Sequence, residues 1–136
     1  MGVDIENGRT LAQSIIAAAG TMATYLWGGW DAVIMALVVM VVLDYVTGLT
    51  ASWVHGRLDS DRGRRGIVRK VGIFVAVAVA NVIDQTGGLG EPVLRTVVAW
   101  FYLGSEAISI VENLGEIGVP IPERLRNALA RLREEE

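Results

Sequence analysis

Among the ionisable residues inside long apolar runs or at their ends, four suggest ion pairing away from water. They are Asp44, Arg69, Lys70 and Glu106. A carboxylate deep in a membrane helix costs roughly 2.5–3.5 kcal/mol on insertion scales, so it should be paired, protonated or turned toward a polar cavity. We therefore predict that these four residues form one buried charge layer.

Counting along the chain places these residues at a similar depth. Asp44 follows Trp30 by 14 residues and Glu106 follows Pro92 by 14 residues, which puts both carboxyls about 21 Å below the outer ends of their helices. Lys70 lies near the inner end of its own run, about 24 Å from the outer side of the hydrocarbon core. The alternative is that each charge reaches the headgroups separately by extending its side chain.

Residue patterns for catalysis and metal binding are absent from the sequence. It has no cysteine and a single histidine, His55, which excludes disulfides and thiolate metal sites and leaves little for acid–base chemistry. The glycines at 87–90 precede Pro92 and lack the Gly-Lys-Ser/Thr of a phosphate-binding loop, so they indicate a turn. We predict no enzyme activity, no cofactor, no metal, no small-molecule substrate and no nucleic-acid partner.

The apolar runs that must position these charges are predicted to be membrane helices. Apolar residues make up 52% of the 136-residue chain, and the charged residues are concentrated at 4–9, 57–70 and 112–136, whereas a soluble helix carries charges on every turn. We predict one all-α domain over residues 1–136, an integral membrane helical bundle of about four transmembrane helices plus a short C-terminal amphipathic helix. The predicted spans are about 10–28, 31–55, 66–85 and 92–114, and the amphipathic cytoplasmic helix is about 122–134.

A basic loop between the second and third spans orients the chain. Half of its 12 cations lie within residues 57–70, and short loops rich in lysine and arginine stay in the cytoplasm. The arginines of the C-terminal helix agree, so we predict that both termini are cytoplasmic. If the first run lay flat in the interface, there would be three spans and an external N-terminus. The loop cations are Arg57, Arg62, Arg64 and Arg65.

Small residues recur at four-residue steps in two of the spans. Membrane helices associate through such faces, so we predict that the second and third spans pack against each other through them. The first run carries a polar stripe that either packs against another helix or faces water. The packing residues are Gly48, Ser52, Gly72, Ala76 and Ala80, and the stripe is Thr10, Gln13, Ser14, Thr21 and Thr24.

Several segments resemble the phage-lysis and toxin-secretion holin family of small multi-span proteins. They are DYVTG at 44–48, GIVRKVG at 66–72, ANVID at 80–84 and, most specifically, SEAISIVENLGEIGVPIPERLRNAL at 105–129. The similarity covers roughly residues 40–132. Many members have asparagine where this chain has Ser105, and lysine-rich loops where it has arginine.

The resemblance implies a holin, which accumulates in the bacterial cytoplasmic membrane, oligomerises and opens lesions that let an endolysin reach the cell wall. The implied partners are the lipid bilayer, further copies of the chain and an endolysin that it does not contact directly. Small-residue faces and buried charges also suit a stable small channel, a transporter subunit or a toxin-export protein. Abrupt, triggered cell death distinguishes the holin from these alternatives.

Overall fold

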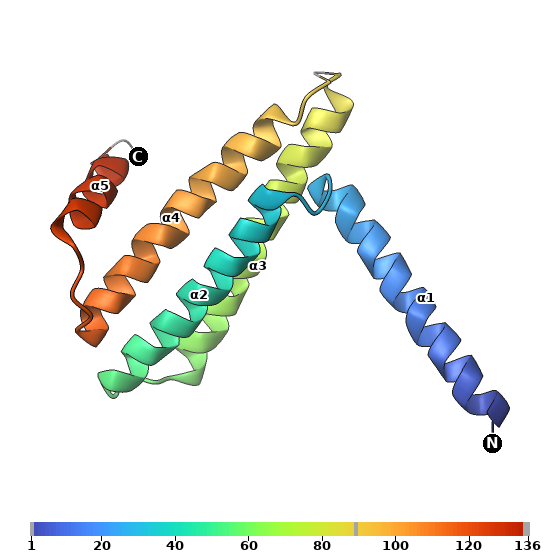
Figure 1. Cartoon of the computed structure of the whole chain (residues 1–136), viewed down its shortest axis with the longest axis horizontal. Coiled ribbons are helices and arrows are strands. Elements are labelled where there is room, and N and C mark those ends of the chain that lie inside the picture. Colours follow the sequence, from blue (N-terminus) through green and yellow to red (C-terminus); the bar gives the residue numbers. More distant parts are fainter. Residues whose placement is uncertain (1, 89, 135–136) are drawn as a thin grey trace.

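The computed structural model describes the backbone of residues 2–88 and 90–134 and, apart from residues 2–5, 62, 129 and 132–134, their side chains. The described chain is all-α, without strands. Its helices are α1 (Gly2–Trp27), α2 (Ala32–Val54), α3 (Ser60–Thr86), α4 (Val93–Ile117) and α5 (Glu123–Glu134) (Figure 1).

The predicted all-α membrane class is confirmed. Three helices are long and apolar enough to cross a membrane, namely α2, residues Gly63–Thr86 of α3, and α4. The first predicted span, α1, is a continuous helix but is not among these three, because its polar stripe dilutes its apolar residues.

The helices α2, α3 and α4 form a bundle in which α4 packs closely along α2 and, less extensively, along α3 (Figure 1). Its core is built from aliphatic side chains that recur at helical spacing on the facing sides. The buried residues of this core are Ile34, Leu37, Val41, Ile73, Val77, Ala99 and Leu103. Trp27 and Phe74 pack against the core from its edge, with ring centroids 5.7 Å apart.

The small-residue packing predicted between the second and third spans is not what the structure contains. A Cβ placed on Gly48 would lie 3.4 Å from Asn113 of α4, and a Cβ on Gly72 would have no neighbour within 4 Å. The physical reason is that polar side chains of α4 and α3 occupy the space beside Asp44, so α2 and α3 make little direct contact. Ala80 is buried, and Ser52 and Ala76 are half-buried.

The first helix meets the bundle only near its C-terminal end and projects away from it (Figure 1). Every side chain from residue 6 to residue 22 is exposed. Gly28 and Gly29, both with positive φ, make the connection to α2. Gly28 is also a close approach, because a Cβ there would lie 2.5 Å from the side-chain oxygen of Asn81.

Candidate functional site

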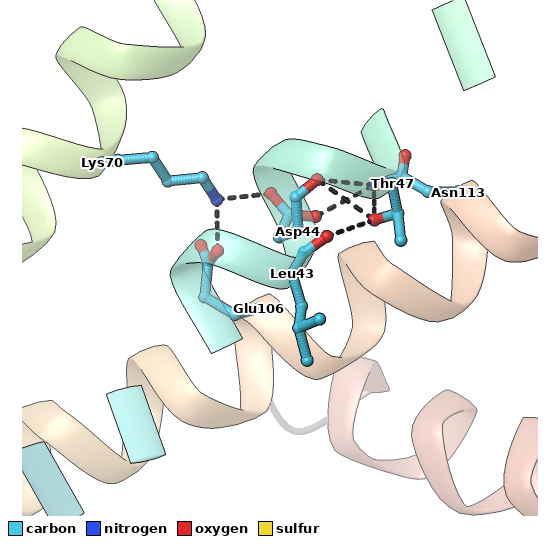
Figure 2. Close-up of polar contacts among 6 residues, drawn as sticks. All are labelled: Leu43, Asp44, Thr47, Lys70, Glu106 and Asn113. Carbon is cyan, nitrogen blue, oxygen red and sulfur yellow. Dashed lines mark hydrogen bonds and ion pairs between the residues drawn. The ribbon is translucent and has the colours of Figure 1, made fainter. Parts of the chain in front are cut away.

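A buried lysine joins the three helices of the bundle. Lys70 of α3 donates through Nζ to Oδ2 of Asp44 in α2 and to Oε2 of Glu106 in α4 (Figure 2). Asp44 is 7% exposed and Glu106 is 1% exposed. We call these three residues the ion triad. Each helix supplies one member, so no helix can leave the bundle without separating opposite charges.

Asn113 and Thr47 complete the surroundings of Asp44. The side-chain amide of Asn113 donates to Oδ1 of Asp44 at 3.0 Å and to Oγ1 of Thr47 at 3.1 Å, and Thr47 donates to the backbone oxygen of Leu43 at 2.8 Å (Figure 2). Both oxygens of Asp44 therefore have donors. The predicted site omitted Asn113, although its position seven residues after Glu106, two turns along the same helix face, was a usable signal.

Arg69 does not belong to the ion triad, contrary to the predicted layer. Its side chain is exposed, whereas that of the adjacent Lys70 is 12% exposed. Consecutive residues on a helix point about 100° apart, so only one of the two can face the bundle. If all members are ionised, the triad holds two negative charges and one positive charge.

Two members of the ion triad, Asp44 and Lys70, line a pocket at the end of the bundle where α2 connects to α3. The pocket has a volume of about 280 Å³, and its lining includes Asp44, Gly48, Lys70 and Asn113. Arg57 and Glu116 also line it and lie 3.6 Å apart, each about half exposed. We call this end of the molecule the basic end. Water or a small polar ligand can therefore approach the triad from the basic end.

A second polar cluster lies at the opposite end of the bundle. Arg95 of α4, which is 3% exposed, donates through Nη1 to Oδ2 of Asp31 at 2.7 Å, through Nε to the backbone oxygen of Trp27 and through Nη2 to that of Gly29 at 3.4 Å. The hydrogen bond from Arg95 holds the pKa of Asp31 below its usual range. One guanidinium thus secures the connection between α1 and α2.

The other members of this cluster bond to helix ends. Asp84 accepts from the backbone N–H groups of Leu94 at 3.0 Å and Arg95 at 2.8 Å, which caps the start of α4. Asn81 donates to the backbone oxygens of Tyr25 and Leu26, each at 3.0 Å, which satisfies the last turn of α1. We call Asp31, Asn81, Asp84 and Arg95 the cap layer, and this end of the molecule the cap end.

The cap layer was not predicted from the sequence. In the sequence, Asp84 and Arg95 lie near the facing ends of the third and fourth predicted spans. A usable signal was their spacing across a glycine-rich turn, since an acidic side chain before a turn can reach the free N–H groups of the helix that follows.

The cations of the predicted basic loop lie at the surface. Arg57 pairs with Glu116, and Arg64 pairs with Asp61 at 2.9 Å, both as exposed pairs. Arg65 is exposed, and the side chain of Arg62 lies outside the described residues. Exposed pairs of this kind contribute little to stability.

The predicted polar stripe of α1 is exposed along its whole length. The hydroxyls of Thr10, Thr21 and Thr24 donate to backbone oxygens four residues earlier, each at 2.9 Å. A threonine bonded in this way needs no further partner. Gln13 and Ser14 make no such bond within the described structure. No group of three or more metal-ligating side chains occurs among the described residues.

These features define a small multi-span membrane protein with polar clusters inside its helical bundle. The chain matches the bacteriophage holin family over residues 21–134, and it belongs to that family, as the resemblance of its sequence predicted. Proteins of this family control lysis at the membrane and are not enzymes.

The relatives are small bacterial and phage proteins. The uncharacterised 14.9 kDa protein of the nagH 3′ region of Clostridium perfringens is 41% identical over 117 residues, covering 86% of this chain and 89% of that protein. Protein Lmo0128 of Listeria monocytogenes is 40% identical, covering 84% and 81%. A protein of Bacillus phage phi105 called a probable holin is 38% identical, covering 68% of each chain. No solved structure matches the chain.

Proposed function

We propose that this protein is a holin that accumulates in the bacterial cytoplasmic membrane, oligomerises and opens lesions that release or activate an endolysin and so time the lysis of the host cell. Membership of the holin family and the likeness to a probable phage holin support a holin role. The endolysin is a functional partner without direct contact.

The observation that carries the proposal is the sharing of Lys70 between Asp44 and Glu106, which come from two other helices. Removing one partner of a buried ion pair costs roughly 3–5 kcal/mol because the remaining charge is left without compensation. A closed bundle held in this way resists opening until many copies together provide alternative contacts for its helices. In a water-filled lesion the same charges are solvated, so the open state no longer bears that cost.

The topology is part of the proposal. With α1 spanning the membrane, the basic end and both termini face the cytoplasm, since the cations of residues 57–70 favour that side. The pocket beside the ion triad then opens toward the cytoplasm, and the cap end lies toward the cell exterior.

Controlled expression in a bacterium, with and without a co-expressed endolysin, tests the proposal. We expect growth to continue and then stop abruptly at a reproducible time in both strains, with loss of the membrane potential at that moment. Culture turbidity should fall sharply only in the strain with the endolysin. A Lys70→Gln variant should shift the time of arrest, whereas an Arg69→Gln variant should leave it nearly unchanged.

A second candidate function is a stable small channel, transporter subunit or toxin-export protein. The polar pocket that leads from the basic end to the ion triad favours this alternative, because such a vestibule suits steady passage of a solute. The same experiment separates the two candidates. A slow decline in growth that scales with expression level and has no defined onset would refute the holin proposal and support the channel.

A further inference from the structure

The first helix is attached to the rest of the molecule at one end only. Asn81 bonds the backbone oxygens of Tyr25 and Leu26, and the indole of Trp27 donates to the backbone oxygen of Phe74 at 3.0 Å. From residue 6 to residue 22 all side chains are exposed. The amide of Gln13 lies about 20 Å along the helix from this attachment, at a depth where a polar group without a partner is costly in a membrane.

The polar stripe of α1 faces away from the chain's own bundle. The side chains of α1 that approach the bundle are the half-buried Ala23, Leu26 and Trp27. At about 100° per residue, Ala17 in the centre of the stripe lies about 120° around the helix from Ala23, about 180° from Leu26 and about 80° from Trp27. The centre of the polar stripe therefore points outward, where none of the described side chains of this chain covers it.

One face of α3 is also left open by the chain's own α1. The residues of α3 that hold α1 are Phe74, Asn81 and Gln85. Arg65 and Gly72 lie about 140–180° around α3 from all three of these residues. Both are exposed, and a Cβ on Gly72 would have no neighbour within 4 Å. Because α1 is anchored on the face of α3 that carries Phe74, Asn81 and Gln85, it cannot reach the face of the same α3 that carries Arg65 and Gly72.

We infer that the polar stripe of α1 packs in parallel against this open face of α3 in a second copy of the same chain. The membrane setting of this inference rests on the proposed function. The hydrogen bond between Asn81 and Leu26 sets the two residues at the same height, and copies in one membrane share that height. When α1 spans the membrane parallel to α3, as in the proposed topology, Ala17 lies level with Gly72, nine residues from the Leu26–Asn81 level toward the basic end. Two small residues then meet where the backbones must approach.

The same alignment gives charge complementarity between the two surfaces. Sixteen residues below the Leu26–Asn81 level, Thr10 lies opposite Arg65, and Glu6 lies one turn further on the same stripe of α1, about 6 Å along the axis. Arg69, one turn above Arg65 on α3, comes within reach of the Gln13 amide oxygen. Glu6, Arg65 and Arg69 are all exposed in the single chain. An arginine side chain spans such an offset, so each cation gains an acceptor.

The two surfaces are different parts of the chain, so the contact is heterologous. Each copy uses its α1 on one neighbour and its α3 on another, and an open row always retains one free surface of each kind. Such contacts form rings or extended arrays and not only pairs. This assembly supplies the many-copy state that the lesion requires.

The absence of native cysteine makes disulfide crosslinking the direct test. Ala17→Cys is placed in a copy with one epitope tag and Gly72→Cys in a copy with another, and the two are co-expressed and oxidised in membranes without an endolysin. We expect dimers that carry both tags, about tenfold more abundant than with the control pair Ile15→Cys and Gly72→Cys, because a disulfide needs Cα atoms within roughly 7 Å. Ile15 is exposed and lies about 160° around α1 from Ala17.

Two outcomes overturn the inference. One is an equal yield of mixed-tag dimers from the test and control pairs, including no dimer from either. The other is a disulfide within one chain when both cysteines are placed together and diluted with cysteine-free copies, which would show that α1 folds onto its own α3. Ala17 and Gly72 are both open positions, and circular dichroism checks that the variants remain helical.

The crosslinking result and the lysis result can fail separately. Mixed-tag dimers in cells that never undergo abrupt arrest would leave the contact standing and remove the holin function. Abrupt arrest without such dimers would support the holin function and refute the contact between α1 and α3 of neighbouring copies. Gly72→Leu should reduce mixed-tag dimers formed between Gln13→Cys and Val68→Cys, which lie level with each other in this alignment, whereas Gly115→Leu, at another open glycine, should not.

Discussion

The ion triad and the cap layer are both polar clusters inside the same bundle, yet they satisfy their charges differently. In the cap layer Asp84 binds two backbone N–H groups at the start of α4, and Arg95 binds two backbone oxygens as well as Asp31. In the ion triad Lys70 binds two carboxylates in the middle of other helices. Helix ends provide spare donors and acceptors, whereas the middle of a helix provides none.

This difference assigns the two clusters different roles. The cap layer fixes how the helices enter and leave the bundle. Asp31 is about half exposed and has water as a substitute partner, whereas Asn81, Asp84 and Arg95 are buried and bond to helix ends. The ion triad has its own three members, the amide of Asn113 and the pocket beside them. Movement of one helix therefore separates opposite charges in the triad, and we propose that the triad is the element that distinguishes a closed bundle from an open one.

Removing the cation of the triad should have the largest effect. Lys70→Gln leaves Asp44 and Glu106 buried with no positive partner, and we expect a loss of roughly 3–5 kcal/mol in the free energy of unfolding. Arg69→Gln is the matched control, since it removes an adjacent but exposed cation. Denaturation of the purified protein in detergent measures both. Equal losses from the two variants would contradict the distinction between Lys70 and Arg69.

A double-mutant cycle should show that the triad acts as a unit. Glu106→Gln removes one of the two carboxylates bonded to Lys70 and leaves Lys70 paired with Asp44 alone. Once Lys70→Gln has removed the cation, neutralising Glu106 also removes one of the two uncompensated carboxylates, so the double variant should lose less stability than the sum of the two single losses, with a coupling energy of roughly 0.5–3 kcal/mol. Asp44→Asn should behave like Glu106→Gln, and either single change should bring the onset of lysis forward.

Glu116→Gln serves as the control for this cycle, because its pair with Arg57 is half exposed and 3.6 Å long. It should alter neither stability nor timing measurably. Additive effects of Glu106→Gln and Lys70→Gln would mean that the two groups are not energetic partners.

Removing a helix cap should cost less than breaking the triad. Asp84→Asn keeps the size of the side chain but weakens its bonds to the N–H groups of Leu94 and Arg95, and loss of such a cap costs roughly 0.5–2 kcal/mol. We expect a lower melting temperature and an unchanged onset of lysis. A shift in onset as large as that of Lys70→Gln would remove the division of roles between the two clusters.

The smallest effect should come from Asp31 and should depend on pH. Its pKa is lowered in the folded state by the hydrogen bond from Arg95, so the stabilisation is present above the unfolded pKa and is lost as the pH falls through the folded pKa. That window lies in acid, below the ordinary value of 3.8. Because the pair is about half exposed on the Asp31 side, it contributes roughly 0–1 kcal/mol.

The measurement is the melting temperature of the wild type and of Asp31→Asn between neutral and strongly acidic pH. The difference between the two proteins should be greatest at neutral pH and should shrink as the pH falls. A difference that grows in acid would reverse the sign inferred for Asp31.

The fold class and the depth of the charges could be derived from the sequence because both depend on length and composition along one helix. Asp44 and Glu106 could be set at equal depth by counting residues, and in the structure they bond to the same ammonium. To decide whether Arg69 or Lys70 faces the bundle, one needs to know how α3 is rotated about its own axis. The spacing of apolar residues in a short run does not define that rotation sharply.

Contacts between elements were harder to derive. The four-residue steps of Gly48 and Gly72 indicate faces suited to packing, but a period along one helix does not identify its neighbour. Asp84 and Arg95 meet because a turn returns α4 to the end of α3, and Arg95 reaches Asp31 because α1 ends beside the same place. Such convergence depends on the whole arrangement of helices, so the cap layer was missed.

The way α4 begins has a practical consequence for engineering. Asp84 on α3 already accepts hydrogen bonds from the N–H groups of Leu94 and Arg95 in the first turn of α4. The position of α4 therefore does not depend on the segment 87–92 between these helices. An epitope inserted after Gly90 should therefore be tolerated without loss of helicity. In intact cells stripped of their wall, an antibody against that epitope would then report which side of the membrane this turn occupies, while the native termini stay unmodified.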